Sequence, residues 1–176
     1  LRKLKGSEEN FISTAADYLY FSLLHGLRRR EASNLRLSDI NLVDRQFVVK
    51  ETKNGRELTL PITEWAAPLI ERRFNRGDSE YLFPGPDLLK PINDPRRVIA
   101  SLRRETTIHF TIHDLRRTFI TVAESLDISI YALKKLVNHS TGWDITADYV
   151  VWDIDRLRKP LHKIQASILG EESRFD

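Results

Sequence analysis

The sequence predicts a mainly α-helical domain with a small antiparallel β-sheet, an α+β arrangement. Apolar residues recur at helical spacing through most of the 176 residues, and two short β-rich segments flank an Asn-Gly turn. With 41% hydrophobic and 30% charged residues, the composition is that of a folded domain rather than a disordered chain. We therefore expect residues 1–176 to form one domain around a single core.

The N-terminal part predicts two helices joined by an elbow. The first helix is expected over Phe11–Leu24, with Ser7 as its N-cap and Gly26 as its C-terminal stop. A shorter helix over Arg29–Leu35 follows at once. Arg28 then lies in the elbow, where its side chain can point into a cleft.

The next segment predicts a β-hairpin. Gln46–Lys50 and Leu58–Leu60 are expected strands, and Pro61 ends the sheet. Between the strands, Asn54-Gly55 is a strong hairpin-turn signal, because both residues tolerate the positive φ of a tight turn. Lys53 comes directly before this turn.

The rest of the chain is predicted to be helical, apart from one short extended piece. Thr111 and Asp114 form the pattern of a capping box at one helix start. The expected elements are a helix from the Thr63 cap to Phe74, the extended piece Tyr81–Pro84, and helices Asp94–Arg104, Ile112–Ser125, Ser129–Val137, Asp144–Tyr149 and Ile154–Leu169.

Several classes of function are disfavoured by the composition. The chain has no cysteine, so disulfide scaffolds and thiolate chemistry are excluded. No apolar run is long enough for a membrane span, and no Gly-rich phosphate loop is present. The close pair His109 and His113 lacks the glutamate of a zinc-protease motif. We therefore expect no metal and no cofactor, while the net charge of +3 hints at an anionic partner.

Five features could carry chemistry, although each alone also fits an ordinary structural role. An arginine run is typical of a solvated helix face, and a turn lysine of a solvated loop. A His-x-x-Arg pair is typical of a helix surface. A histidine at a helix end is favourable without any function, and a tyrosine is commonly a core aromatic. The features are Arg28 at the head of an Arg28-Arg29-Arg30 run, Lys53, His113-x-x-Arg116, His139 and Tyr149.

Taken together and in this order, the features resemble the catalytic domain of the tyrosine recombinases, the phage integrase family. The resemblance runs from about Phe11 to Tyr149. It is carried by four segments, which are Gly26–Leu35, His113–Phe119, Asn138–Thr141 and Thr146–Val150. The family commonly has glycine where this chain has Asn138, and asparagine also tolerates a left-handed conformation.

The resemblance implies a role for each residue in cutting a DNA phosphodiester. Fixed cations would stabilise the charge that develops on the phosphate, and guanidinium groups can bind its oxygens bidentately. The implied roles are phosphate binding by Arg28 and Arg116, a further donor in His139, proton acceptance by His113, a general acid in Lys53, the nucleophile in Tyr149 and support from Glu31.

The resemblance also implies the partners and the reaction. We expect a site-specific recombinase that forms a 3′-phosphotyrosyl intermediate on double-stranded DNA, without metal or nucleotide, to integrate or excise a mobile element or prophage. It would act as a homo-tetramer on paired DNA sites and be a monomer without DNA, in the bacterial cytoplasm on the nucleoid. The chain begins at Leu1 and lacks methionine, so we expect a fragment without the family's N-terminal DNA-binding domain.

Some alternatives stay open from sequence. Within the same chemistry these are Xer-like resolution of DNA dimers and strand relaxation of the type IB topoisomerase kind. From another class, the chain could be a catalytically silent DNA-binding domain. Ile154–Leu169 is an amphipathic helix that either closes the core of its own chain or docks on a neighbouring subunit.

Overall fold

The computed structural model describes residues 2–52, 55, 57–139 and 153–171. In this part the chain is mainly helical with one small antiparallel sheet, which confirms the predicted fold class. The expected helix Asp144–Tyr149 and the residues Lys53, Asn54 and Tyr149 lie outside the described residues. The elements are α1 (Arg2–His25), α2 (Arg29–Ser33), a 3₁₀ turn (Leu37–Asp39), β1 (Ile40–Asn41), β2 (Gln46–Val49), β3 (Leu58–Pro61), α3 (Ala67–Arg76), α4 (Arg96–Thr106), α5 (Ile112–Ser125), α6 (Ile130–Leu136) and α8 (Asp155–Leu169).

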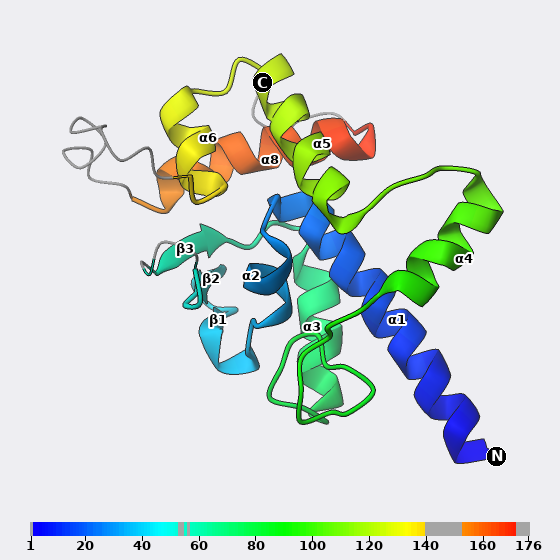
Figure 1. The fold of residues 1–176 in the computed structure, drawn as a ribbon. Helices are drawn as coiled ribbons and strands as arrows, with labels where there is room; N and C mark the ends of the chain where they lie inside the picture. The colour runs from blue at the N-terminus through cyan, green and yellow to red at the C-terminus, as the bar shows by residue number, and fades with distance from the viewer. Residues whose placement is uncertain (1, 53–54, 56, 140–152, 172–176) are drawn as a thin grey trace.

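The long helix α1 is the axis around which the other elements pack (Figure 1). The sheet, α2 and α3 lie on one side of α1, α4 lies on the other, and α5, α6 and α8 gather around its C-terminal end. Phe21 of α1 is at the centre of the core, with ring centroids 5.3 Å from Phe47 of β2 and 5.4 Å from Phe83. Within the described residues, each helix is too short or too polar to span a lipid bilayer.

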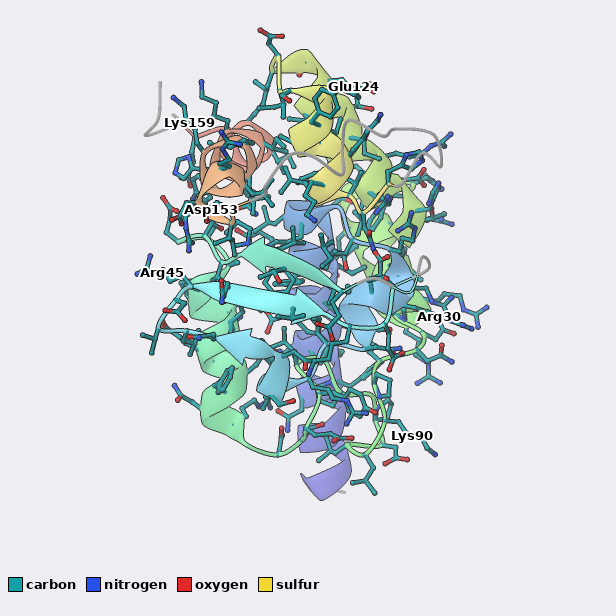
Figure 2. All side chains as sticks on the ribbon, turned by 90° about the vertical axis from the view of Figure 1, so that its left-hand side faces the viewer. Arg30, Arg45, Lys90, Glu124, Asp153 and Lys159 are labelled. Atoms are coloured by element: carbon teal, nitrogen blue, oxygen red, sulfur yellow. The ribbon has the colours of Figure 1, made fainter. Side chains whose placement is uncertain are left out.

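The sheet has the order β1-β2-β3, with both pairs antiparallel. Phe47 pairs with Leu60 and Val49 with Leu58, and all four side chains are buried. Figure 2 shows the strands crossing in front of α1, so this buried face completes the core. Strand β1 was not predicted, because two residues are too few to show an alternating pattern. At the hairpin, Gly55 has the expected positive φ of 71°.

Some predicted helix boundaries were wrong. The first helix begins at Arg2, so Ser7 lies inside it and is not its N-cap. The Arg-Lys-Leu-Lys segment before Ser7 consists of good helix formers, which extend the helix beyond the predicted start. Helix α3 begins at Ala67, because the Thr63 carbonyl first accepts the amides of Ala66 and Ala67 in a turn, and Pro68 then occupies the first helical turn.

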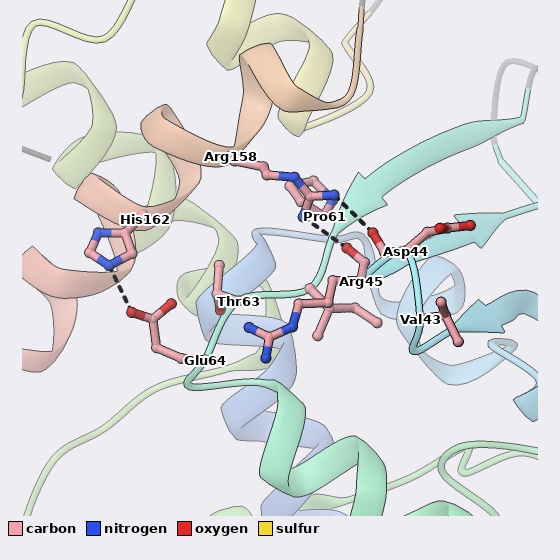
Figure 3. A pocket seen from close by; sticks show the side chains of 9 residues that line it. Val43, Asp44, Arg45, Pro61, Thr63, Glu64, Arg158 and His162 are labelled. Atoms are coloured by element: carbon pink, nitrogen blue, oxygen red, sulfur yellow. Dashed lines mark hydrogen bonds and ion pairs between the residues drawn. The ribbon is translucent and has the colours of Figure 1, made fainter. Parts of the chain in front are cut away.

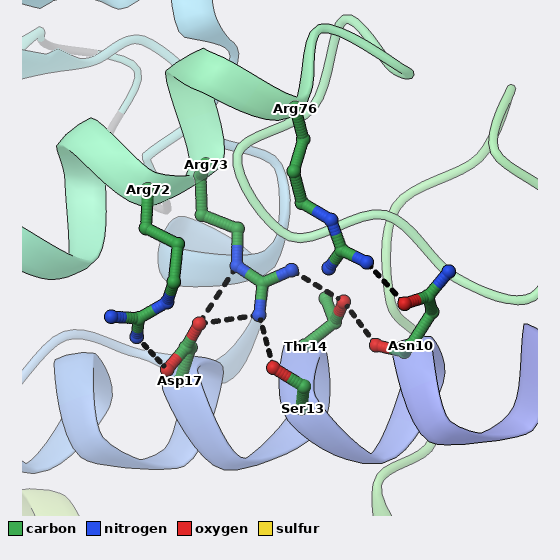
Figure 4. Close-up of polar contacts among 7 residues, drawn as sticks. All are labelled: Asn10, Ser13, Thr14, Asp17, Arg72, Arg73 and Arg76. Carbon is green, nitrogen blue, oxygen red and sulfur yellow. Dashed lines mark hydrogen bonds and ion pairs between the residues drawn. The ribbon is translucent and has the colours of Figure 1, made fainter. Parts of the chain in front are cut away.

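A cluster of polar side chains ties α3 to α1 (Figure 4). The guanidinium of Arg73 is buried and binds the carboxylate of Asp17, with Nε 2.8 Å from Oδ2. The same guanidinium donates to Thr14 Oγ1 at 2.8 Å and to Ser13 Oγ at 3.2 Å. Arg72 contacts Asp17 from the solvent side, at 2.7 Å. Arg73 therefore fixes α3 against α1 through contacts with one largely buried carboxylate and two hydroxyl groups.

Helix α8 packs against the rest of this chain with one apolar face. Leu157, Leu161 and Ile164 are buried in the common core, where α8 meets α1, α5, α6 and β3. The buried Gln165 donates to the Leu24 carbonyl at 2.8 Å and accepts from Thr63 Oγ1 at 2.5 Å. The C-terminal helix is thus joined by a fully buried amide to the end of α1.

The outer side of α8 borders a cavity of about 380 Å³ (Figure 3). Arg158 reaches across to the β1–β2 turn and donates to the carbonyls of Asp44, at 2.8 Å, and Arg45, at 3.1 Å. His162 Nε2 lies 2.9 Å from Glu64 Oε1 on the opposite wall. The cavity is therefore closed on two sides by polar contacts that also hold α8 in place.

His25 is a fully buried histidine at the C-terminal end of α1. Its ring stacks on Phe21, with centroids 4.1 Å apart, and lies 5.1 Å from the ring of Phe47. Nδ1 donates to the Phe21 carbonyl at 3.0 Å. Burial lowers the pKa of His25 from 6.5 to about 4, although the carbonyl contact opposes this shift. His25 is therefore neutral in the folded protein at physiological pH.

Loss of the Arg73 contacts should strongly destabilise the fold. We expect Arg73→Met to lower the free energy of unfolding by about 3 kcal/mol, because Asp17 would keep a largely buried charge without its main partner. Arg72→Met is the matched control, since its side chain is 54% exposed and should cost less than about 1 kcal/mol. Equal costs in urea unfolding would show that burial of the ion pair does not matter.

The stability should depend on pH through His25. Below pH 6.5 the unfolded chain gains a proton on His25, whereas the folded chain does not until about pH 4. Stability is therefore complete above pH 6.5 and falls between pH 6.5 and 4, by about 2 kcal/mol at pH 5. Urea unfolding at pH 7 and pH 5 should show this loss in the wild type and a smaller loss in His25→Phe. A loss of the same size in His25→Phe would assign it to other groups.

Candidate active site

The elbow that carries Arg28 is formed by Gly26. Gly26 ends α1 with φ of 60°, and its amide donates to the Ser22 carbonyl at 3.0 Å. A Cβ atom at this position would lie 2.4 Å from Cδ1 of Phe119 in α5. Both the backbone conformation and the close approach of α5 thus require glycine here. Arg28 follows in an extended conformation, immediately before α2.

Glu31 holds Arg28 from the first turn of α2. Its side chain is 2% exposed, and Oε1 accepts from Nη1 of Arg28 at 2.8 Å. Oε2 accepts from the backbone amide of Arg28 at 2.9 Å. The carboxylate therefore fixes both the backbone and the guanidinium of Arg28. The contacts of the described residues use only the Nη1 group of this guanidinium.

Arg116 connects the elbow to the end of α6. This arginine of α5 is only 7% exposed, and Nη1 donates to the Gly26 carbonyl at 2.7 Å. Nη2 donates to the Val137 carbonyl, also at 2.7 Å. Burial, with a contribution from the charge of Arg28, lowers the pKa of Arg116 to about 10, while Glu31 opposes the shift. Arg116 therefore stays protonated at neutral pH.

His139 directly follows a tight turn that ends α6. The amide of His139 donates to the Lys134 carbonyl at 2.9 Å, and the amide of Asn138 donates to Lys135 at 3.2 Å, the two bonds of a Schellman motif. Asn138 has φ of 50°, which confirms that asparagine adopts the left-handed conformation here. The Asn138 carbonyl accepts from Nη1 of Arg28 at 3.2 Å. The exposed His139 is thus next to a turn that both arginines contact.

His113 lies in the first turn of α5, exposed and one turn before Arg116. The predicted capping box is confirmed. Thr111 Oγ1 accepts the Asp114 amide at 3.3 Å, and Asp114 Oδ2 accepts the Thr111 amide at 2.9 Å. The hydrogen bond from the Thr111 hydroxyl lowers the pKa of Asp114. The capping box fixes the start of α5, and with it the direction of His113 and Arg116.

The structure brings Arg28, Glu31 and Arg116 together, at the turn that leads into His139. Lys53 and Tyr149 are predicted site residues outside the described part of the chain. At the base of the hairpin, Asn34 of the segment after α2 donates to Glu51 Oε2 at 2.5 Å. Glu51, two residues beyond the end of β2, is therefore joined to the C-terminal end of α2.

The sequence reasoning missed the backbone acceptors of this site. These are the carbonyls of Gly26, Val137 and Asn138, which carry no side-chain signal. The available signals are Gly26 and Asn138 themselves, because both residue types favour the left-handed ends of helices. Such an end directs carbonyl groups away from the helix axis, where an arginine can reach them.

The arrangement is suited to an oxyanion with several acceptor oxygens. The cluster holds two guanidinium groups and one buried carboxylate, Glu31, which is bonded to Arg28 alone, so it keeps a net positive charge beside an exposed histidine. Planar guanidinium groups bind phosphate oxygens with charge-assisted hydrogen bonds. The residues of this cluster do not line the cavity beside α8. The chemistry of the site therefore favours a phosphate group of a large ligand that approaches from outside.

Comparisons with known proteins identify the family of the chain. A family model described as "Phage integrase family" matches residues 7–151. The prophage integrase IntF of Escherichia coli K12 is 27% identical over 168 residues, covering 89% of this chain and 35% of that protein. The tyrosine recombinase XerA of Pyrococcus furiosus is 31% identical over 134 residues, covering 71% of this chain and 46% of that protein. The chain thus spans less than half the length of these two relatives.

A solved structure has the same fold. The Tn1549 transposon integrase, in complex with circular intermediate DNA, superposes with a TM-score of 0.60 at 19% identity. The match covers 94% of this chain and 62% of that one. At this identity the likeness concerns the fold, which is that of an integrase.

The requirement for Gly26 can be tested against a matched glycine. Gly77 has the same φ of 60°, but its nearest contact for an added Cβ is the Phe74 carbonyl at 4.0 Å. We expect Gly77→Ala to cost about 1 kcal/mol of unfolding free energy and Gly26→Ala about 2 kcal/mol more, because its Cβ also overlaps Phe119. Urea unfolding measures both. Equal costs for the two substitutions would mean that α5 can move away from an added Cβ at Gly26 without loss of stability.

Proposed function

The chain belongs to the phage integrase family, and from this premise we propose that it is the catalytic domain of a site-specific DNA recombinase. The proposed reaction cuts and rejoins DNA strands through a 3′-phosphotyrosyl intermediate, to integrate or excise a mobile element or prophage.

One observation carries the proposal. Arg28 lies in the elbow before α2 and Arg116 lies in α5, yet each donates to one of the two residues that precede His139, Arg28 to Asn138 and Arg116 to Val137. In sequence, Arg28 lies 110 residues from its acceptor Asn138. A solvated arginine run does not require its side chains to converge on one turn, and neither does a surface His-x-x-Arg pair. Two cations fixed at the same turn are what a phosphodiester site needs, because fixed cations stabilise the negative charge that develops during phosphoryl transfer.

Tyr149 is the proposed nucleophile. A tyrosine has a pKa of about 10, so its hydroxyl must lose the proton as it attacks at neutral pH. We assign proton acceptance to His113 and additional phosphate contact to His139. As the Tyr149 Oη–P bond forms, the bond from phosphorus to the 5′ oxygen breaks. Lys53 is the proposed acid that gives this leaving oxygen its proton.

The proposed step needs no external energy source. The phosphodiester is exchanged for a phosphotyrosine ester, so a second 5′ hydroxyl can reverse the step and rejoin strands. The arginines would supply the positive charge that other phosphoryl-transfer sites obtain from metal ions. Metal and nucleotide independence are accordingly part of the proposal. Glu31 supports the site by holding Arg28, to which it is bonded through both carboxylate oxygens.

The proposed partner is double-stranded DNA. The Tn1549 integrase of the same fold was solved with DNA, and the exposed Arg29, Arg30 and Arg117 add positive charge around the site. Figure 2 shows Arg30 directed outward from α2. Such contacts would make affinity fall with salt. We further propose that the protein is a monomer without DNA and assembles as a tetramer on paired DNA sites. It would act in the bacterial cytoplasm, on the nucleoid.

Covalent capture tests the proposed chemistry. The full-length protein is mixed with nicked duplexes of randomised sequence, in which the cleaved strand loses a short fragment and cannot be religated. We expect an adduct that survives denaturing electrophoresis, together with a free 5′ hydroxyl on the released fragment. Tyr149→Phe should form none, because it lacks the attacking oxygen.

Tyr131→Phe is the matched control, since Tyr131 is a partly exposed tyrosine on α6. It should form as much adduct as the wild type. No adduct from the full-length wild type, or one that persists in Tyr149→Phe, would contradict the proposal. Exchange of strands between two duplexes, as opposed to relaxation of a supercoiled circle, then separates a recombinase from a topoisomerase.

A further inference from the structure

We infer that Asn138 is a positioning residue, whose left-handed conformation presents the backbone carbonyls that hold Arg28 and Arg116 beside His139. The inference rests on the proposed function and deepens it. It concerns a residue at which no chemistry was predicted, and it assigns the effect to the backbone of Asn138.

The turn makes contacts on both of its sides. On one side, the amides of Asn138 and His139 close the end of α6 on Lys135 and Lys134. On the other side, successive carbonyls accept from the two arginines, Val137 from Arg116 at 2.7 Å and Asn138 from Arg28 at 3.2 Å. One backbone conformation therefore sets both the end of the helix and the separation of two cations.

A right-handed conformation at Asn138 would remove this arrangement. The helix would continue through His139, and the carbonyls of Val137 and Asn138 would run along the helix axis. Arg116 is buried and keeps its other contact with the Gly26 carbonyl, so it cannot follow a displaced Val137 without leaving the elbow. The turn must therefore be left-handed for Arg28, Arg116 and His139 to face one phosphate.

Residue type decides how strongly the turn is held. Glycine and asparagine enter the left-handed region with little strain, whereas alanine is strained there by its Cβ. Asn138→Gly removes the side chain but still favours the left-handed conformation. Asn138→Ala has a small side chain and disfavours that conformation. The pair separates a role of the backbone from a role of the amide group.

Asp127 provides a matched control elsewhere in the chain. It has φ of 51°, almost the same as Asn138, and lies in the connection between α5 and α6. The end of α5 is about 14 Å along the helix axis from Arg116. Asp127→Ala introduces comparable strain at a helix end without touching the arginine contacts.

The experiment uses the full-length protein and a nicked duplex, enriched from a randomised pool by covalent capture with the wild type. The single-turnover rate of adduct formation is measured at saturating protein, and duplex affinity is measured separately by fluorescence anisotropy. Thermal midpoints show that each variant is folded at the assay temperature. A purely structural role would lower the midpoint but would leave the rate of the folded, DNA-bound protein unchanged.

We expect Asn138→Ala to slow adduct formation about tenfold, because alanine is strained in the left-handed conformation and most molecules would leave it. Duplex affinity should stay within about twofold of wild type. Asn138→Gly should recover the rate lost in Asn138→Ala. Asp127→Ala should lower the thermal midpoint as much as Asn138→Ala does and keep the wild-type rate.

Two results would overturn the inference while leaving the proposed function intact. One is a wild-type rate in Asn138→Ala, and the other is a rate in Asn138→Gly as low as in Asn138→Ala, which would assign the effect to the side chain. Absence of an adduct with the wild type itself would overturn the proposed function, and this inference with it.

Discussion

The buried guanidinium of Arg116 is the contact on which the rest of the site depends. It lies between two stretches of backbone that are remote in sequence, with the Gly26 carbonyl on one side and the Val137 carbonyl on the other. A buried cation is unfavourable without partners, so the fold must keep both carbonyls in place. The elbow before α2 and the end of α6 are consequently held at a fixed separation. Arg28 and His139, which follow these two stretches, are positioned by the same constraint.

The helices were largely predictable because their signals are local. Thr111 and Asp114 mark the start of α5 within four residues of sequence, and the structure follows them to the residue. Ser129 likewise caps α6, with its hydroxyl accepting from Ala132. Failures arose where one local signal competed with another. Ser7 is a good N-cap in isolation, but the helix formers before it continue α1, and Pro68 moves the start of α3 away from Thr63.

The candidate site was predictable only as a set of residue types. Arg28, Arg116 and His139 were identified by their order and local context, and Glu31 was assigned a supporting role. Sequence could not give their partners, because the acceptors are backbone carbonyls 90 residues away from Arg116 and 110 residues away from Arg28. The burial of Arg116 was likewise invisible, since a neighbour in sequence, Arg117, is exposed on the same helix. Distances of this kind follow from packing of the whole chain.

The way α8 is held has a consequence for how this protein can diverge during evolution. Arg158 and Gln165 donate to the carbonyls of Asp44, Arg45 and Leu24, and every amino acid offers a carbonyl. Substitutions in the β1–β2 turn therefore leave the acceptors in place as long as the backbone path is kept. A change of side chain in that turn thus preserves the contact with α8 if the left-handed conformation of Arg45 is kept, whereas loss of the Arg158 side chain removes the contact outright.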